Sequence, residues 1–520
     1  MNDSLPTNTN LLSLISYRYL VSADATAIPG KVFNTIGACL GYIAGQGAEK
    51  IGKIFVKRKN DGTTWKENIE LLATEINWSN LEIEFDNNAI LEGVKDKDSN
   101  KYGSAILIDG AGSDRIDISD RTWSYTISTN TFTKLTGSDI TVPGSQSMYF
   151  LINNVVYKSS AITATTIVLD TTFKKYKGIG DYNYPIVISC LLENYFFNIK
   201  IKANIDANYH NNTTADTAMK GISCFACDLE FDGFIKNCRR NNDSLEVFHN
   251  EWYYTEFLNS QSRSGIGVTC NYSTLKIKDI INCSTNFAGS IVHSNAGLYS
   301  QYSAISARNI MNCFCKGGAG YDGGIGIVNT KMTVNNIINC YASANAGAGI
   351  ITTKSTLKFN TIRNCRAGSS TGGIVVTDDS NVSGNIIENC EAETGVGGGA
   401  NISGHSVANI GTVSNNKTLA ENSRGGGIII DGESSLTVGQ LINNNAYSSG
   451  SFTQGGGIYI TDTCGLIQIG MAQGNVDGQN GNNNIYNNAT AGTQLIDIVQ
   501  SASYIAGNAR ATGSREVVNS

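Results

Sequence analysis

The chain has 520 residues, of which 41% are hydrophobic and only 16% are charged, with 56 Gly and 4 Pro. A formal net charge of -6 without a basic stripe excludes a surface built to neutralise nucleic-acid phosphates. The 13 Cys, an odd number, indicate reduced thiols rather than a disulfide framework.

Residues 1–24 are expected to form an N-terminal arm. The apolar part of this segment is short and is interrupted by Arg18, so it predicts neither a signal peptide nor a membrane anchor. No other stretch has the roughly 18 to 20 apolar residues that are needed to span a bilayer. We therefore expect a protein that is made and folded in a cytoplasm.

Residues 25–115 predict a capping helix at residues 35–44, a strand at Lys53–Val56, and further strands in "TTWKENIEL" and "LEIEFDNNAILEG". The stretch from Ile28 to Gly93 resembles the start of pectin-lyase-like right-handed parallel β-helix proteins. In those proteins a phrase of the type "F.TI..A" leads into the first coils, and a helix caps the end. The resemblance implies an all-β solenoid, a fold that hosts lyases, hydrolases, esterases and structural proteins.

Residues 116–185 predict antiparallel hairpins. Apolar and polar residues alternate in "MYFLINNVVYKSS" on both sides of an Asn-Asn turn. This segment is interpreted as an insertion on the flank of the solenoid or as a small β domain.

Residues 186–500 predict the coils of a parallel β-helix, and residues 501–520 a loosely held polar tail. Two markers recur in phase about every 25 residues: an Ile-Asn-Cys triplet, as in "NNIINCYA", and a Gly-rich step into an apolar run, as in "GGGIII". The runs between them are short, β-branched and alternating, with no sustained helical period. Leucine-rich repeats would need a helical return, and propeller blades would be longer.

Stacked coils lie roughly 4.8 Å apart, so equivalent residues lie over one another. The triplet Asn is expected to point inward at a bend, where its amide hydrogen-bonds the next Asn in a ladder. The Cys that follows is expected to be a small buried hydrophobe. Disulfides between stacked Cys are an alternative, because the coil spacing is compatible with their geometry.

Ionisable residues follow the Gly-marked strands of three successive coils. The same position holds Asp379, His405 and Glu433, and Asp378 and Asp431 lie just before it in their own coils. Two carboxylates several ångströms apart can act as the proton donor and the base or nucleophile of glycoside hydrolysis. These five residues are therefore the candidate catalytic set; the alternative is that they are turn formers facing solvent.

The Asp378-Asp379 pair and the Gly404-His405 step, one coil apart, resemble the paired Asp and Gly-His step of polygalacturonases. The pattern departs from that family because the Asp pair follows its strand, Ser406 replaces a Gly, and no Arg-Ile-Lys match follows. No pectate-lyase or pectinesterase pattern is present.

Two other groups of side chains have spacings that suggest a binding role. Trp252 and Tyr254 alternate onto one face of "EWYYTEF" and are candidate carbohydrate-binding residues, with core packing as the alternative. Cys224 and Cys227 have half of a zinc spacing without a second pair, which favours a structural role. No metal and no cofactor are predicted.

A long β-helix without a secretion signal looks like a bacteriophage tailspike or tail fibre. That resemblance implies a virion protein, made in the host cytoplasm, that forms a homotrimer and joins other tail proteins through its N-terminus. It also implies a host surface glycan as ligand, which such proteins bind or cleave, and no nucleic acid or membrane span. The alternatives are a bacterial cell-surface β-helix adhesin and a free polysaccharide hydrolase or lyase.

Overall fold

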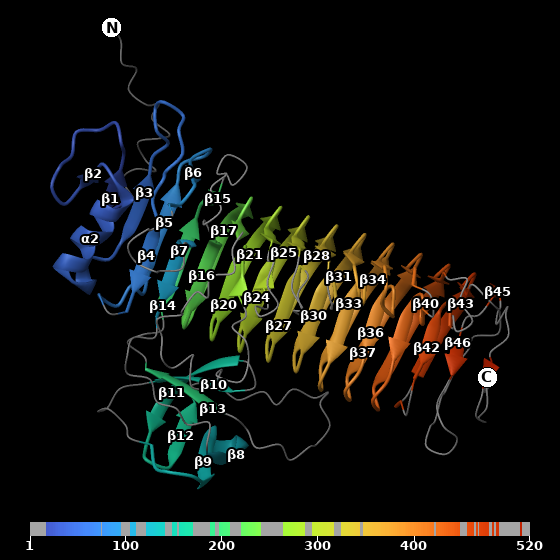
Figure 1. Cartoon of the computed structure of the whole chain (residues 1–520). Coiled ribbons are helices and arrows are strands. Elements are labelled where there is room, and N and C mark those ends of the chain that lie inside the picture. The colour runs from blue at the N-terminus through green and yellow to red at the C-terminus, as the bar shows by residue number, and fades with distance from the viewer. Residues whose placement is uncertain are drawn as a thin grey trace.

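The computed structural model describes most of the chain as one solenoid and a small separate sheet (Figure 1). The residues described are 17–73, 75–94, 104–110, 121–140, 148–152, 155–169, 188–192, 197–207, 220–240, 264–286, 294–316, 324–343, 347–420, 423–447, 455–461, 464–465, 467–477, 481–482, 485–487 and 510–511. The coils follow one another from the blue N-terminal end to the red C-terminal end.

Two sheets run the length of the solenoid and a third begins at β18, and we name the first two by their strands. The long-strand sheet contains, in order, β2 (Val32–Phe33), β1 (Tyr19–Val21), β3 (Lys53–Val56), β5 (Leu81–Phe85), β14 (Phe197–Lys202), β17 (Cys227–Lys236), β21 (Thr274–Ile281), β25 (Ala304–Met311), β28 (Lys331–Ile338), β31 (Thr356–Arg363), β34 (Asn381–Glu388), β37 (Val407–Ser414), β40 (Ser435–Ile442) and β43 (Ile467–Gln473), with β15 (Asn204–Asp206) and β6 (Ile90–Leu91) off this path. The short-strand sheet contains β4 (Ile69–Leu72), β7 (Ser104–Asp109), β16 (Lys220–Phe225), β20 (Val268–Asn271), β24 (Leu298–Gln301), β27 (Ile325–Val328), β30 (Ile350–Thr353), β33 (Ile374–Thr377), β36 (Ala400–Ile402), β39 (Ile428–Ile430), β42 (Ile458–Ile460), β46 (Ile485–Asn487) and β47 (Arg510–Ala511). The third sheet contains β18 (Arg239–Arg240), β22 (Ser284–Asn286), β26 (Phe314–Lys316), β29 (Tyr341–Ala342), β32 (Arg366–Ala367), β35 (Glu391–Ala392), β38 (Lys417–Thr418), β41 (Asn445–Ala446), β44 (Val476–Asp477) and β45 (Gly481–Asn482), and β19 (Ser264–Gly265) pairs with β23 (Ser294–Asn295).

From β18 onwards, the described coils contribute a strand to each of the three sheets and stack in parallel on the next coil. In one coil, for example, β33 leads through a turn to β34, which leads through a second turn to β35. All three strands pair in parallel with their equivalents one coil on, β36, β37 and β38. The predicted parallel β-helix is confirmed.

A helix covers the N-terminal end of the solenoid (Figure 1). Thr35 caps α2 (Ile36–Gln46), because its side-chain oxygen accepts a hydrogen bond from the Ala38 N–H at 3.1 Å. The buried residues of α2 join the solenoid core, and the short helix η1 (Ala48–Lys50) follows it. The predicted helix and the strand at Lys53–Val56 are present. β1, which lies within the segment expected to be an arm, pairs in parallel with β3.

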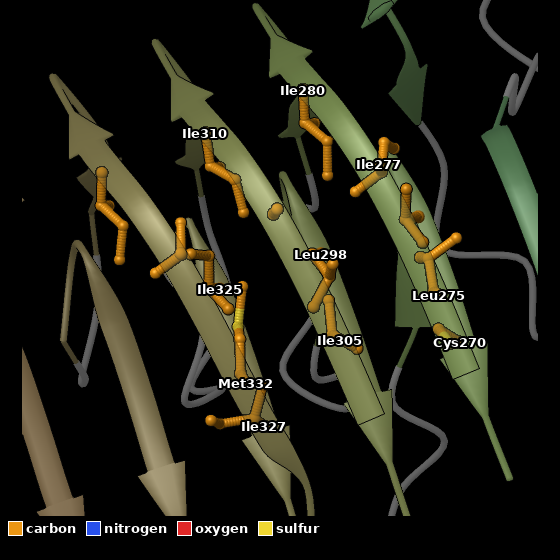
Figure 2. Close-up of a cluster of buried hydrophobic side chains, with 14 of the residues drawn as sticks. Cys270, Leu275, Ile277, Ile280, Leu298, Ile305, Ile310, Ile325, Ile327 and Met332 are labelled. Atoms are coloured by element: carbon orange, nitrogen blue, oxygen red, sulfur yellow. The ribbon is translucent and has the colours of Figure 1, made fainter. Parts of the chain in front are cut away.

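The core is the space between the sheets, filled by one side chain in two along each long strand. Leu275, Ile277 and Ile280 of β21 point inward and are at most 4% exposed. Figure 2 shows them packed beside their equivalents from the following coils. The inward positions of successive coils therefore form continuous apolar columns, which supply most of the hydrophobic stabilisation.

The inward placement predicted for the triplet Asn is wrong, although one predicted amide–amide hydrogen bond is present at the surface, from the Asn339 amide to the Asn312 side-chain oxygen at 3.1 Å. Each triplet Asn of the described coils lies near the surface with a left-handed backbone, φ 52–57°, a conformation that Asn tolerates better than most residues. The residue after it points inward instead. This inward column consists of Cys238, Cys283, Cys313, Cys340, Cys365, Cys390, Asn416, Asn444 and Asn475, each at most 1% exposed.

The buried Asn ladder therefore begins where the Cys column ends. The Asn416 amide N–H donates to the Asn444 side-chain oxygen at 2.9 Å, and the Asn444 amide donates to Asn475 at 2.9 Å. The 12 Cys whose side chains the structure describes are free and buried, as expected for reduced thiols. The same buried position is thus filled by thiols in the earlier coils and by ladder-forming amides in the later ones.

A second buried ladder lies at the turn between the short-strand and long-strand sheets. In each coil a backbone N–H donates to a Ser or Thr hydroxyl one coil on, at 2.9–3.4 Å. The hydroxyl residues are Ser273, Ser303, Thr330, Ser355, Ser380, Ser406 and Ser434. This ladder satisfies buried turn amides and holds successive turns in register.

The described strands of the segment predicted to form hairpins belong to a separate antiparallel sheet. In sheet order its strands are β13 (Ile188–Leu192), β10 (Met148–Ile152), β11 (Val155–Ile162), β12 (Thr166–Leu169), β9 (Thr131–Thr136) and β8 (Thr122–Thr126), and the short helix η2 (Ile127–Thr129) joins β8 to β9. β13 lies within residues 186–500, which were predicted to form coils, but it pairs antiparallel with β10, so that boundary is wrong there and the next coil strand is β14. β10 and β11 form the predicted hairpin, with Ile152 opposite Val155. In the part of the chain that the structure describes, no helix is long and apolar enough to cross a membrane.

The two Asn at one bend provide a direct test of the inward assignment. Asn444→Ala should lower the free energy of unfolding by about 3 kcal/mol, because it leaves buried groups without partners. Asn443→Ala, the neighbouring substitution at the surface, should cost about 1 kcal/mol, because Ala tolerates a left-handed backbone less well than Asn does. Urea unfolding followed by tryptophan fluorescence measures both, and a larger loss for Asn443→Ala would contradict the assignment.

Candidate functional site

The turn that joins the short-strand sheet to the long-strand sheet positions the predicted catalytic residues. β33, β36 and β39 stack with their first residues opposite one another. The Asp379 N–H donates to the Gly404 carbonyl at 2.7 Å, and the His405 N–H donates to the Gly432 carbonyl at 2.8 Å. Asp379, His405 and Glu433 therefore occupy one row across three successive coils, as the sequence register predicted.

His405 and Glu433 are in direct contact. The His405 Nε2 lies 3.4 Å from the Glu433 Oε2, and the two side chains are 58% and 68% exposed. A contact this exposed adds little stability, since solvent screens it. The contact places the imidazole beside the carboxylate on an open surface.

Asp378 lies on the preceding position of the same turn, where the next two coils have glycine. Its φ is 52° and that of Asp379 is 59°, so two consecutive non-glycine residues hold a left-handed backbone. A Cβ added to Gly404 would lie 2.8 Å from the Asp378 nitrogen and 3.1 Å from its Oδ1. The Asp378 side chain thus lies over Gly404, and the turn retains backbone strain of a kind that clusters at functional sites.

Asp431 lies on the short-strand side of the same turn. Its N–H donates to the Ile402 carbonyl at 3.0 Å, and it is partly exposed. The five predicted residues therefore gather at one edge over three coils, and we call Asp378, Asp379, His405, Asp431 and Glu433 the acidic edge. Their catalytic role stays a prediction.

The acidic edge holds two carboxylates that lie two coils apart. Two coil steps separate Asp379 from Glu433, which places their backbones about 9.6 Å apart. Two carboxyl groups on one face are the residue types that act as the proton donor and the base or nucleophile of glycoside hydrolysis.

A column of hydroxyl residues runs beside the acidic edge. Thr353, Thr377 and Ser403 occupy the same outward position of successive coils as Asp431, and all are partly exposed. The Thr353 and Thr377 hydroxyl oxygens are 3.2 Å apart. Sequence reasoning missed this column, although the Gly-marked register that aligned the acidic residues would have found it.

The other candidates do not join this edge. Trp252 and Tyr254 lie outside the described residues, so their carbohydrate-binding role stays a prediction. Cys224 and Cys227 are buried, and the Cys227 N–H donates to the Ser273 hydroxyl at 3.2 Å. Within the described ranges, no group of three or more His, Cys, Asp and Glu side chains could hold a metal ion.

No protein-family model and no curated protein matches the chain. Among solved structures, it is similar to the Gp54 tailspike of Acinetobacter baumannii bacteriophage AP22 in complex with A. baumannii capsular saccharide, at 10% identity over 94% of this chain and 79% of that chain, with a TM-score of 0.27. The tailspike gp61 of Pseudomonas phage phi297 has 9% identity over 90% and 80%, with a TM-score of 0.38. The tailspike gp49 of Pseudomonas phage LKA1 has 8% identity over 90% and 76%, with a TM-score of 0.24.

The strain at the Asp378 turn can be measured. Asp378→Gly should raise the free energy of unfolding by about 1 kcal/mol, because glycine adopts a left-handed backbone without a Cβ penalty. Gly404→Ala should lower it by about 1–3 kcal/mol, because the new Cβ is both left-handed and crowded by Asp378. As a control, Asn381→Gly, in β34, should be destabilising. A destabilised Asp378→Gly variant in urea unfolding would rule out strain at this turn.

Proposed function

We propose that this chain is a bacteriophage tailspike or tail-fibre protein that recognises a host surface polysaccharide and cleaves it at the acidic edge. The observation that carries the proposal is the row of Asp379, His405 and Glu433, brought together from three coils on an exposed face. The proposal includes a homotrimer attached to the virion through its N-terminal region.

An extended polymer fits the geometry of this face. Equivalent side chains repeat about every 4.8 Å along the solenoid, so polar groups are presented in a line rather than in a closed pocket. The hydroxyl column beside the acidic edge supplies hydrogen-bonding groups at the same repeat. A polysaccharide lying parallel to the axis would contact several coils at once.

The proposed reaction is hydrolysis with inversion at the anomeric carbon. Glu433, which lies beside His405, accepts a proton from a water as that water attacks the anomeric carbon. Asp379 donates a proton to the glycosidic oxygen as the carbon–oxygen bond breaks. One proton is gained and one is lost by the two carboxyl groups, so exchange with solvent restores the starting state.

The test is incubation of the purified protein with capsular polysaccharide and lipopolysaccharide from candidate host strains. Asp379→Asn and Glu433→Gln should each slow the loss of polymer length about 10²–10⁴-fold, because each removes a proton-transfer group. Size-exclusion chromatography measures the rate, and NMR of the new reducing ends should show the inverted anomer first.

The matched control is Glu230→Gln, which removes an exposed carboxylate on the long-strand sheet that pairs with Lys276 at 2.7 Å. It should leave the rate unchanged. Full activity in both acidic-edge variants would overturn the catalytic assignment. Binding by the wild-type protein without cleavage would leave recognition alone, and sedimentation analysis tests the trimer.

A further inference from the structure

The outer face of the long-strand sheet changes in character along the solenoid. In earlier coils this face is charged, and the charges pair across coils, as where Lys276 binds Glu230 at 2.7 Å. In later coils, β37, β40 and β43 contain no Asp, Glu, Lys or Arg. The surface of a soluble protein is ordinarily about 25–35% charged, so this part of the sheet is unusual. We define the uncharged face as five polar residues of these strands that are at least partly exposed: Asn409, Thr412, Thr437, Gln440 and Gln468.

The uncharged face borders the acidic edge. β40 begins at Ser435, two residues after Glu433. His405, Val407 and Asn409 are exposed at alternate positions of one segment, and the residues between them are buried. These three side chains therefore point to the same side of the solenoid. A ligand at the acidic edge would reach the uncharged face across Val407, a large apolar side chain that is 39% exposed.

The uncharged face has hydrogen-bond donors to offer. The Thr412 hydroxyl donates to the Gln440 side-chain oxygen at 3.4 Å, and the Thr437 hydroxyl donates to the Gln468 side-chain oxygen at 3.3 Å. Both bonds use the oxygen of the Gln amide and leave its nitrogen over. Within the described ranges, the side-chain N–H groups of Gln440, Gln468 and Asn409 have no hydrogen-bond partner. Such N–H groups can donate to the hydroxyl and ring oxygens of a sugar.

The charge of the acidic edge disfavours an anionic ligand. Its four carboxylates outnumber His405 and Lys354, which lies one coil away with its N–H donating to the Asp378 carbonyl at 3.0 Å. A polymer with carboxylate groups would bring like charges together at this edge, which costs affinity. A protein partner is disfavoured for another reason, since the uncharged face has none of the aromatic and Arg anchors that dominate protein interfaces.

We infer that the substrate of the acidic edge is an uncharged polysaccharide, held by the uncharged face beside it. The inference rests on the proposed function and adds the substrate class to it. Asn409, Gln440 and Gln468 donate hydrogen bonds to sugar oxygens, and Val407 packs against an apolar C–H face of a sugar. Amides suit this task better than charged groups, because a neutral sugar does not offset the cost of removing a charge from water.

The test measures the Kd of the whole protein for uncharged and carboxylated capsular polysaccharides from candidate host strains, at low ionic strength and at a temperature where cleavage is slow. Each carboxylated polymer is also tested after its carboxyl groups are reduced to alcohols. Uncharged polymers should bind. A carboxylated polymer should bind about tenfold more weakly than its reduced form, because the acidic edge repels it.

Substitutions on the uncharged face locate the binding site. Asn409→Asp and Gln440→Glu keep the shape of the side chain and remove its N–H donors, so each should weaken the Kd for an uncharged polymer about tenfold. Asn335→Asp is the matched control, because Asn335 is an exposed amide of β28, three coils before β37. It should leave the Kd unchanged.

The inference is overturned, while the proposed function stands, if a carboxylated polymer binds as tightly as its reduced form or more tightly. An unchanged Kd in both Asn409→Asp and Gln440→Glu has the same meaning, as does an equal loss in Asn335→Asp. Failure of the wild-type protein to bind any polymer overturns both. Thermal melting checks that each variant is folded, and Asn409→Ser replaces Asn409→Asp if that variant is not.

Discussion

The register of one coil on the next is the constraint on which the rest of the structure depends. Parallel backbone hydrogen bonds set the step between coils, and the buried ladder of Ser and Thr hydroxyls fixes the turn that joins the short-strand and long-strand sheets. A slip of one residue would turn every long-strand side chain to the opposite face. The apolar columns inside and the polar rows outside therefore depend on the same register.

The same register explains why function on this scaffold is linear. A closed pocket needs side chains that converge, whereas stacked coils deliver equivalent side chains at a constant step. His405 meets Glu433 because their coils are neighbours, and Tyr302 meets Tyr272 for the same reason. The residue at this turn position differs from coil to coil, as Tyr302, Lys354 and Glu433 show. The residue that follows it is a buried Ser or Thr in each of these coils.

Sequence reasoning reached the positions that follow from periodicity. The Gly-marked strands predicted that Asp379, His405 and Glu433 share a row, and the structure places them in one. It failed at the bend, where Asn443 was expected inside and Asn444 is the buried residue. The period of a repeat does not reveal which of two adjacent residues takes the left-handed backbone, and that choice decides which side chain turns inward.

By itself, the sequence determined the solenoid, its step of about 25 residues, the capping helix and the alignment of the acidic edge, because all of these follow from local pattern and repetition. Only the tertiary structure decided which bend residues are buried and that Asp378 lies over Gly404. These depend on backbone dihedral angles and on the distance between side chains of different coils. Such quantities exist only once the coils are stacked.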